Sequence, residues 1–380
     1  MYNRQIPSNK TGESWDISCR PGEMGIIENG ACAGMPFDEY IAHDIKGVLG
    51  IRVAPSTTFP LLIKLIDAND TLSVQVHPDD KYAARASSDT MTGTTTSVST
   101  SPFNNTSKTQ HPSTDDTGKT EMWYILAPPT DGKLIIGLKP GTTAKALQNA
   151  CKQGTVETLL NRLEVKTGDI INIPAGLVHA LTPGTVVAEV QQNSDITYRL
   201  YDYNRLGPDG KPRQLHINDA IAVADFDDKI PKATVHGLPI IKGDCTLTYA
   251  IANQHFAIIK YELAPRKETP AKSMPITNFV TEASNPMTFC IYTCVEGEAE
   301  VIYAGTPHNE STSSPCITLP TGRSIFIPAG LGSYSLRAKN GKPCILLKSF
   351  VPDIEQDFIA PLRQHGYTNE EIATKTFISK

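Results

Sequence analysis

The chain has 380 residues, 39% hydrophobic and 20% charged, which is typical of a globular protein with room for two domains. Its formal net charge of −5 argues against a general nucleic-acid binder, which would carry a basic stripe. No apolar run approaches the roughly 20 residues that a membrane-spanning helix needs. The N-terminus also lacks an apolar signal core, so we expect a cytoplasmic protein without a membrane segment.

Short runs rich in Val, Ile, Thr and Tyr, separated by Gly and Pro, predict a mainly β chain. In chain order they include TLSVQVH, EMWYILA, KLIIGL, DIINIPA, TVVAEVQQ and ITYRLYDY. Residues 87–118 are rich in Ser and Thr and poor in bulky apolar residues, which predicts a flexible surface insertion. Residues 143–163 have helical spacing, with Gly154 between two helices.

One unit occurs twice, as GDIINIPAGLVHAL from Gly168 and as GRSIFIPAGLGSYSL from Gly322. This internal repeat predicts two similar β-barrels in tandem, over residues 1–203 and 237–350. We expect a helical connector at 204–236 and a helical tail at 351–380. The first copy places His179 where the second has Ser333. We therefore expect the first barrel to carry a site and the second to be a degenerate structural duplicate.

Polar residues on three inward-facing strand positions predict a metal site in the first barrel. In TLSVQVH, strand alternation puts Ser73, Gln75 and His77 on one face. In GKTEMWYIL it aligns Lys119 with Glu121, and His179 follows the first I-P-A-G corner. Buried polar groups need partners. Gln75, His77, Glu121 and His179 form a nitrogen and oxygen donor set that suits zinc or another divalent transition metal.

Two basic residues are candidates for binding an anion. Arg199, in ITYRLYDY, is a fixed positive charge with a planar fork of donors, shortly after the candidate ligand His179. Lys64, in FPLLIKLIDAND, has apolar residues on both sides, so its ammonium must reach the surface or serve a pocket.

The combination of motifs resembles one known family. GESWDIS, FPLLIKLIDANDTLSVQVHPDD, GKTEMWYIL, IPAGLVHAL and QQNSDITYRLYDYNRLGPDGKPRQLHI, in this order, are similar to the type I mannose-6-phosphate isomerases (phosphomannose isomerases) of the cupin superfamily. The resemblance implies two cupin, or jelly-roll, barrels and the interconversion of mannose 6-phosphate and fructose 6-phosphate. It implies one zinc ion per chain, held by Gln75, His77, Glu121 and His179. It also implies an active-site role for Arg199 and a substrate pocket lined by Lys64, Ser73 and Lys119.

The chemistry of such an isomerase assigns roles to these residues. Moving a carbonyl between C1 and C2 requires removal of a neighbouring proton and stabilisation of a cis-enediol or enediolate, which a zinc ion can polarise. We expect Lys119, near the metal and Arg199, to have a lowered pKa and to act as the base. We expect Arg199 either to hold the phosphate or to stabilise the enediolate.

Two alternatives remain open at this point. A metal-dependent cupin dioxygenase would use iron at a similar ligand set, and a sugar-binding cupin would bind without turnover. Lys119 and Arg199 suit an anionic sugar phosphate better than the aromatic or thiol substrate of a dioxygenase, and a binding cupin would not need both beside the metal. The expected partner is therefore a small sugar phosphate, bound by a monomer or homodimer.

Overall fold

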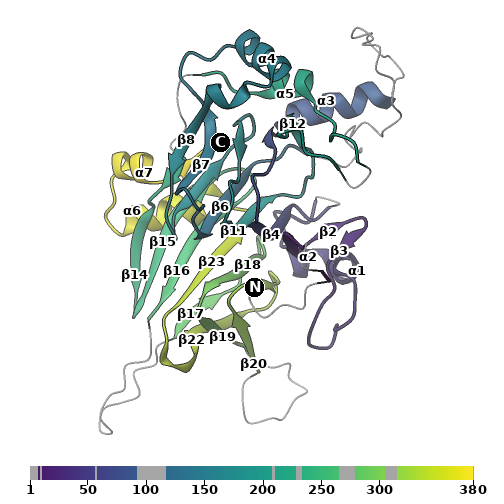
Figure 1. The fold of residues 1–380 in the computed structure, drawn as a ribbon. Coiled ribbons are helices and arrows are strands. Elements are labelled where there is room, and N and C mark those ends of the chain that lie inside the picture. The colour runs from purple at the N-terminus through teal and green to yellow at the C-terminus, as the bar shows by residue number, and fades with distance from the viewer. Residues whose placement is uncertain are drawn as a thin grey trace.

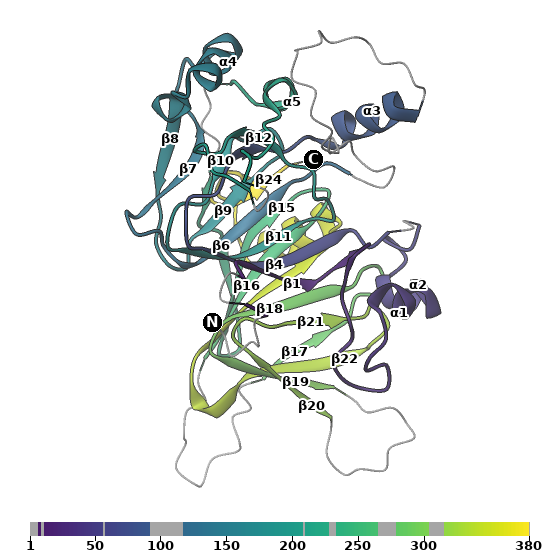
Figure 2. The ribbon, with the colours of Figure 1, turned by 45° about the vertical axis from the view of Figure 1, so that its right-hand side comes forward.

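The computed structural model describes residues 7–8, 11–55, 58–91, 117–207, 210–227, 233–264, 279–303 and 315–379. The chain is mainly β, as predicted, and forms two tandem cupin barrels. Figures 1 and 2 show the first barrel above the second, with the C-terminal helices beside the second. No helix among these residues is long and apolar enough to cross a membrane.

Two sheets face each other in the first barrel. One has the order β1 (Glu13–Ile17), β4 (Leu61–Ala68), β11 (Thr185–Gln192), β6 (Glu121–Ala127), β9 (Ile170–Ile173) and β13 (Thr234–Val235). The other has the order β12 (Tyr198–Tyr201), β5 (Val74–Val76), β10 (His179–Ala180), β7 (Lys133–Leu138) and β8 (Leu160–Glu164). All eight residues of β11 are buried, because this strand is central in its sheet and covered on both faces.

The second barrel repeats this plan. Its larger sheet has the order β14 (Leu238–Lys242), β15 (Cys245–Ala252), β16 (Ala257–Leu263), β23 (Cys344–Phe350), β18 (Cys290–Glu296) and β21 (Ser324–Ile327). Its smaller sheet has the order β17 (Val280–Ala283), β22 (Ser333–Ala338), β19 (Glu298–Tyr303) and β20 (Cys316–Pro320). The repeated I-P-A-G units end β9 and β21, which pair with β6 and β18 in the same way.

The helices are short and lie outside the barrels (Figure 1). They are α1 (Phe37–His43), α2 (Ile45–Leu49), α3 (Asp80–Met91), α4 (Ala144–Gln153), α5 (Ile217–Val223), α6 (Ala360–Gln364) and α7 (Asn369–Lys375). Shorter pieces are the hairpin of β2 (Cys19–Arg20) and β3 (Glu23–Met24), 3₁₀ turns at Val156–Leu159 and Lys339–Gly341, and a π-helical turn at Ile354–Ile359. Thr143 caps α4 by accepting a hydrogen bond from the Ala146 N–H, and Gly154 ends it at a φ of 69°.

Four expected boundaries differ from the structure. Residues 160–163, expected to be helical, belong to β8, which pairs with β7. The connector contains β13, which extends the first barrel's sheet, and the tail adds β24 (Phe377–Ile378) parallel to β15. The first residues of the predicted 87–118 insertion continue α3 to Met91, and 92–116 lie outside the described residues. In each case pairing with a distant strand or continuation of a helix overrides the local composition.

The two barrels share a hydrophobic core that local sequence patterns did not predict. The Phe289 ring lies 5.0 Å from the Phe59 ring and 5.3 Å from the Phe326 ring, measured between centroids. Phe37, from α1, packs 5.1 Å from Phe326. The N-terminal part of the chain therefore contacts the second barrel, although its strand β1 belongs to the first.

Candidate metal centre and active site

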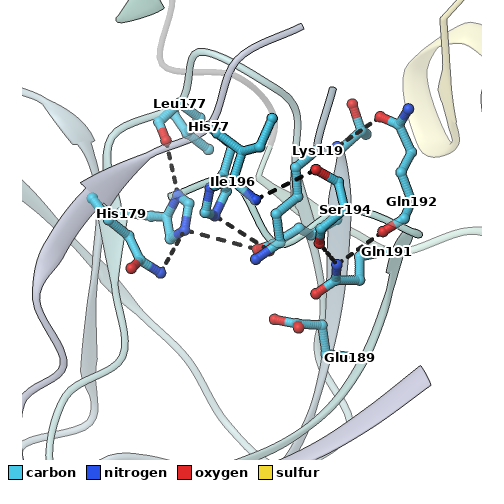
Figure 3. A network of polar contacts seen from close by, with 12 residues as sticks. His77, Lys119, Leu177, His179, Glu189, Gln191, Gln192, Ser194 and Ile196 are labelled. Atoms are coloured by element: carbon cyan, nitrogen blue, oxygen red, sulfur yellow. Dashed lines mark hydrogen bonds and ion pairs between the residues drawn. The ribbon is translucent and has the colours of Figure 1, made fainter. Parts of the chain in front are cut away.

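Three of the predicted ligands meet inside the first barrel. His77 follows β5, Glu121 begins β6 and His179 begins β10, so strands from both sheets bring them together. Their ligand atoms all lie within 4.8 Å of one another, with His77 Nε2 3.3 Å and His179 Nε2 3.8 Å from the Glu121 carboxylate (Figure 3). All three side chains are at most 1% exposed. No second such group of three occurs elsewhere among the described residues.

The two imidazoles are oriented by backbone carbonyls. Nδ1 of His77 lies 2.8 Å from the Ile196 carbonyl, and Nδ1 of His179 lies 2.8 Å from the Leu177 carbonyl (Figure 3). Because a carbonyl only accepts, each Nδ1 carries the proton and donates it. Each neutral ring then directs the lone pair of Nε2 toward Glu121. This is the tautomer and the outer contact that metal-binding histidines use.

The charges of the centre match those of metal ligands. Burial, with a contribution from Lys119, lowers the pKa of His77 to about 3, and burial lowers the pKa of His179 as well. Burial alone would raise the pKa of Glu121, but Lys119 and the two histidines hold it well below its usual value. His77 Nε2 and the Glu121 oxygen Oε2 are buried without a hydrogen bond to any described residue, whereas Glu121 Oε1 lies 2.8 Å from Lys119 Nζ. Unpaired buried acceptors of this kind fit a bound cation.

Gln75 lies beside the three residues, with its amide nitrogen rather than its oxygen toward His179. It is directly opposite His179 in the strand register. Its amide nitrogen is 3.4 Å from His179 Nε2, and its oxygen accepts a 3.4 Å hydrogen bond from the Ser73 hydroxyl. A metal at the centre needs the amide oxygen instead, which a rotation of the amide by 180° would provide.

Lys119 lies against the centre as a paired cation. Its Nζ is 2.8 Å from the Glu121 carboxylate, and its side chain is 6% exposed. The backbone N–H of Lys119 donates to the Pro78 carbonyl at 2.9 Å, which fixes the residue just before β6. Burial would lower the pKa of Lys119, but Glu121 and Glu189 together raise it. The expectation of a lowered pKa is therefore wrong for this arrangement, because two carboxylates outweigh the burial.

Glu189 is a site residue that the sequence reasoning missed. It lies on β11 opposite Lys64 on β4 and Trp123 on β6. The Trp123 indole N–H donates to its carboxylate at 2.7 Å, and Lys64 Nζ lies 3.9 Å away. Burial, with the nearby charge of Glu121, raises the pKa of Glu189 to about 7. The available signal was a lone acid in the otherwise apolar run TVVAEV, matched by a lone lysine in FPLLIKLI.

Arg199 lies at the rim of the same site. It is opposite Gln75 in the register of β12 and β5, and its Nε donates to the Ser73 hydroxyl at 3.3 Å. Its Nη1 donates to the Gln214 carbonyl at 3.0 Å. The candidate substrate residues Ser73 and Arg199 are thus connected to each other and, through Gln75, to the metal centre.

Comparisons with known proteins identify the family of this chain. A family model described as the phosphomannose isomerase type I catalytic domain matches residues 1–94. A probable mannose-6-phosphate isomerase, GmuF, of Bacillus subtilis is 35% identical over 272 residues, covering 71% of this chain and 76% of that protein. The chain belongs to the type I phosphomannose isomerase family. The family resemblance predicted from the motifs is therefore confirmed.

Other phosphomannose isomerases match over most of their length. The mannose-6-phosphate isomerase ManA of Bacillus subtilis is 30% identical over 335 residues, covering 88% of this chain and 89% of that protein. The crystal structure of the mannose 6-phosphate isomerase from Bacillus subtilis superimposes with a TM-score of 0.70 at 26% identity, covering 92% of each chain. The family match thus extends over both barrels.

Proposed function

We propose that this chain is a zinc-dependent mannose-6-phosphate isomerase, which interconverts mannose 6-phosphate and fructose 6-phosphate through a cis-enediol or enediolate. The observation that supports this proposal most is the buried group of His77, Glu121 and His179 with its unpaired acceptor atoms. The related proteins named as mannose-6-phosphate isomerases support the choice of substrate. We place the reaction in the cytoplasm, in a monomer or homodimer.

His77, Glu121 and His179, with the Gln75 amide oxygen, would hold one zinc ion per chain. When bound, zinc supplies Lewis-acid polarisation of the sugar's carbonyl and hydroxyl oxygens. Two neutral imidazoles and one carboxylate leave a net positive charge there, which favours an enediolate. The chain's own contribution is to keep the imidazoles neutral through burial and the carbonyls of Ile196 and Leu177.

Isomerisation moves a proton between C1 and C2 of the sugar, and the base that carries this proton should titrate near neutral pH. The sequence predicts Lys119 for this role, but its ion pair with Glu121 raises its pKa and favours the ammonium form, which would donate toward a developing oxyanion. Glu189, with a pKa raised to about 7, is the better candidate for the base. Lys64 and Trp123 would then orient its carboxylate and limit how far its pKa rises.

Arg199 would hold the phosphate of the substrate. The half-buried position of its side chain at the rim, away from the fully buried centre, suits a charged group that stays partly hydrated. Its two bonds, to Ser73 and to the Gln214 carbonyl, leave the guanidinium fixed in direction. Stabilisation of the enediolate by Arg199 is the alternative, which a kinetic measurement separates.

The test is a coupled assay that follows conversion of mannose 6-phosphate to fructose 6-phosphate by the full chain. We expect turnover that disappears with a chelator and returns with added zinc. Oxygen uptake in place of isomerisation would indicate a cupin dioxygenase. Binding of the sugar phosphate by the folded, zinc-loaded protein without turnover would indicate a binding cupin.

A further inference from the structure

The strand registers identify which residues of the second barrel replace the metal centre. Glu121 pairs with Ile173 of the first I-P-A-G unit, and Cys290 pairs with Ile327 of the second. Gln75 pairs with His179, and Ala283 pairs with Ser333. In order, the positions of Gln75, His77, Glu121 and His179 are therefore taken by Ala283, Asn285, Cys290 and Ser333. This set lacks both imidazoles and the carboxylate, so it would not hold zinc in the same way.

The buried acid of the first barrel has been replaced by a base. Glu189 pairs with Trp123 on β6, and Lys348 pairs with Tyr292 on β18 at the corresponding place. The ammonium of Lys348 lies 5.8 Å from the Tyr292 ring centroid, 5.9 Å from that of Tyr261 and 5.6 Å from that of Phe350. Aromatic rings stabilise a cation at such distances. At this position the two barrels thus carry ionisable side chains of opposite charge, Glu189 in the first and Lys348 in the second.

A cavity of about 550 Å³ opens at this place in the second barrel. Ala283, Asn285 and Cys290, the replaced ligand positions, line it together with Lys348. Its size falls in the range of about 300–1,000 Å³ that is usual for small-molecule sites. The cavity therefore lies in the second barrel at the place that corresponds to the candidate metal centre of the first, with other residues at the ligand positions.

The lining carries two lysines and two carboxylates, and a positive excess arises because Arg52, outside the lining, neutralises one of the carboxylates. Lys348 lies 3.7 Å and Lys242 2.8 Å from the same Glu282 carboxylate, so two cations share one anion. The other lining carboxylate, Asp357, pairs with Arg52 at 2.8 Å. Burial disfavours the charged form of Lys348, but Tyr261, Cys290, Tyr334 and Glu282 hold its pKa well above the usual value. The ammonium therefore remains charged at neutral pH.

We propose that this cavity is a second ligand-binding site, separate from the metal centre, which binds a small organic anion of about hexose size. Lys348 would pair with the phosphate or carboxylate of the ligand, with Lys242 assisting from the edge strand β14. The aromatic side chains Tyr261 and Phe350 would contact its carbon skeleton. This proposal does not rest on the isomerase activity of the first barrel.

Equilibrium dialysis of the zinc-loaded full chain tests the proposal with three probes: fructose 6-phosphate, inorganic phosphate and gluconate. Lys348→Met removes the cation and leaves Glu282 paired with Lys242. Lys260→Met is the matched control, since Lys260 lies on the neighbouring strand β16, between the lining residues Ile259 and Tyr261, and is absent from the cavity wall. We expect at least one probe to lose one bound molecule per chain in Lys348→Met and to keep it in Lys260→Met. Isomerase kcat/KM should stay within about twofold of wild type in both variants, because neither residue belongs to the first barrel.

The probes identify the anion. Binding of phosphate and fructose 6-phosphate alone would assign a phosphate site, and binding of gluconate alone would assign a carboxylate site. Equal binding of every probe by wild type and Lys348→Met, at concentrations up to roughly 1 mM, would overturn the proposal.

A second variant decides the matter if Lys348→Met fails to fold. Glu282→Gln leaves both lysines without their shared carboxylate, so affinity for the bound probe should rise on the order of tenfold, because one unit charge in partly buried surroundings is worth at least that factor. Unchanged or weaker binding in Glu282→Gln would overturn the proposal as well.

Discussion

Replacing Lys64 by Met tests how the buried pair of Lys64 and Glu189 controls the active site. Both side chains are nearly fully buried, at 5% and 4% exposed, and their charged atoms are 3.9 Å apart. At an effective dielectric constant of about 20, that attraction is worth about 4 kcal/mol, or about three pKa units. Without Lys64, the pKa of Glu189, already raised to about 7, should therefore rise to roughly 10.

The consequence for stability follows from proton linkage. The pKa of Glu189 is about 7 in the folded protein and 4.5, its ordinary value, in the unfolded chain. The folded wild type therefore loses stability as the pH rises between these two pKa values. Above about pH 7 this loss stops in wild type, but it should continue in Lys64→Met by about 1.4 kcal/mol per pH unit. The cost of the substitution should thus be about 1.4 kcal/mol greater at about pH 8 than at about pH 6.

Urea unfolding with a chelator present, at these two pH values, measures this difference for wild type and Lys64→Met. The control is the same substitution in the Glu189→Gln background: Lys64→Met/Glu189→Gln should cost the same at both pH values when it is compared with Glu189→Gln. Equal costs of Lys64→Met at the two pH values would refute the reasoning, as would a pH-dependent cost of Lys64→Met in the Glu189→Gln background.

Three further outcomes are expected. If Glu189 is the base, kcat/KM of wild type should fall as the pH drops below about 7. Glu189→Gln should lose about 10²–10⁴-fold in kcat, and its pH–rate profile should have no inflection near that pH. An inflection that remains in this variant would exclude the role. Arg199→Lys should raise KM and leave kcat within a few-fold in steady-state kinetics, whereas a fall in kcat at constant KM would assign Arg199 to the enediolate. Phe289→Ala should lose about 3–5 kcal/mol in urea unfolding, because the ring is fully buried between the barrels. The exposed Ile241→Ala should change stability by less than about 0.5 kcal/mol, and a similar loss in both variants would contradict a shared core.

Much of the fold and the metal centre was predictable because the signals are local. Strand alternation places His77 and Glu121 on inward faces, and the I-P-A-G corner turns His179 toward them. The internal repeat reveals two barrels, because a duplicated unit needs a duplicated framework.

The remaining features depend on which distant strands pair. The opposition of Glu189 and Lys64 arises only from the register of β11 and β4, more than a hundred residues apart in the chain. The raised pKa of Lys119 depends on two carboxylates from different strands. The addition of β24 to the second barrel could not be read from a two-residue strand, because so short a run carries no periodicity.

The central claim is that the active metal is held by the first barrel alone. The most direct measurement is the zinc content and isomerase turnover of the same preparations of wild type, Glu121→Gln and Cys290→Ser, its counterpart in the second barrel. We predict one zinc per chain and full turnover in wild type and Cys290→Ser, with both lost in Glu121→Gln. Zinc and turnover retained by folded Glu121→Gln, or lost from Cys290→Ser, would contradict the account.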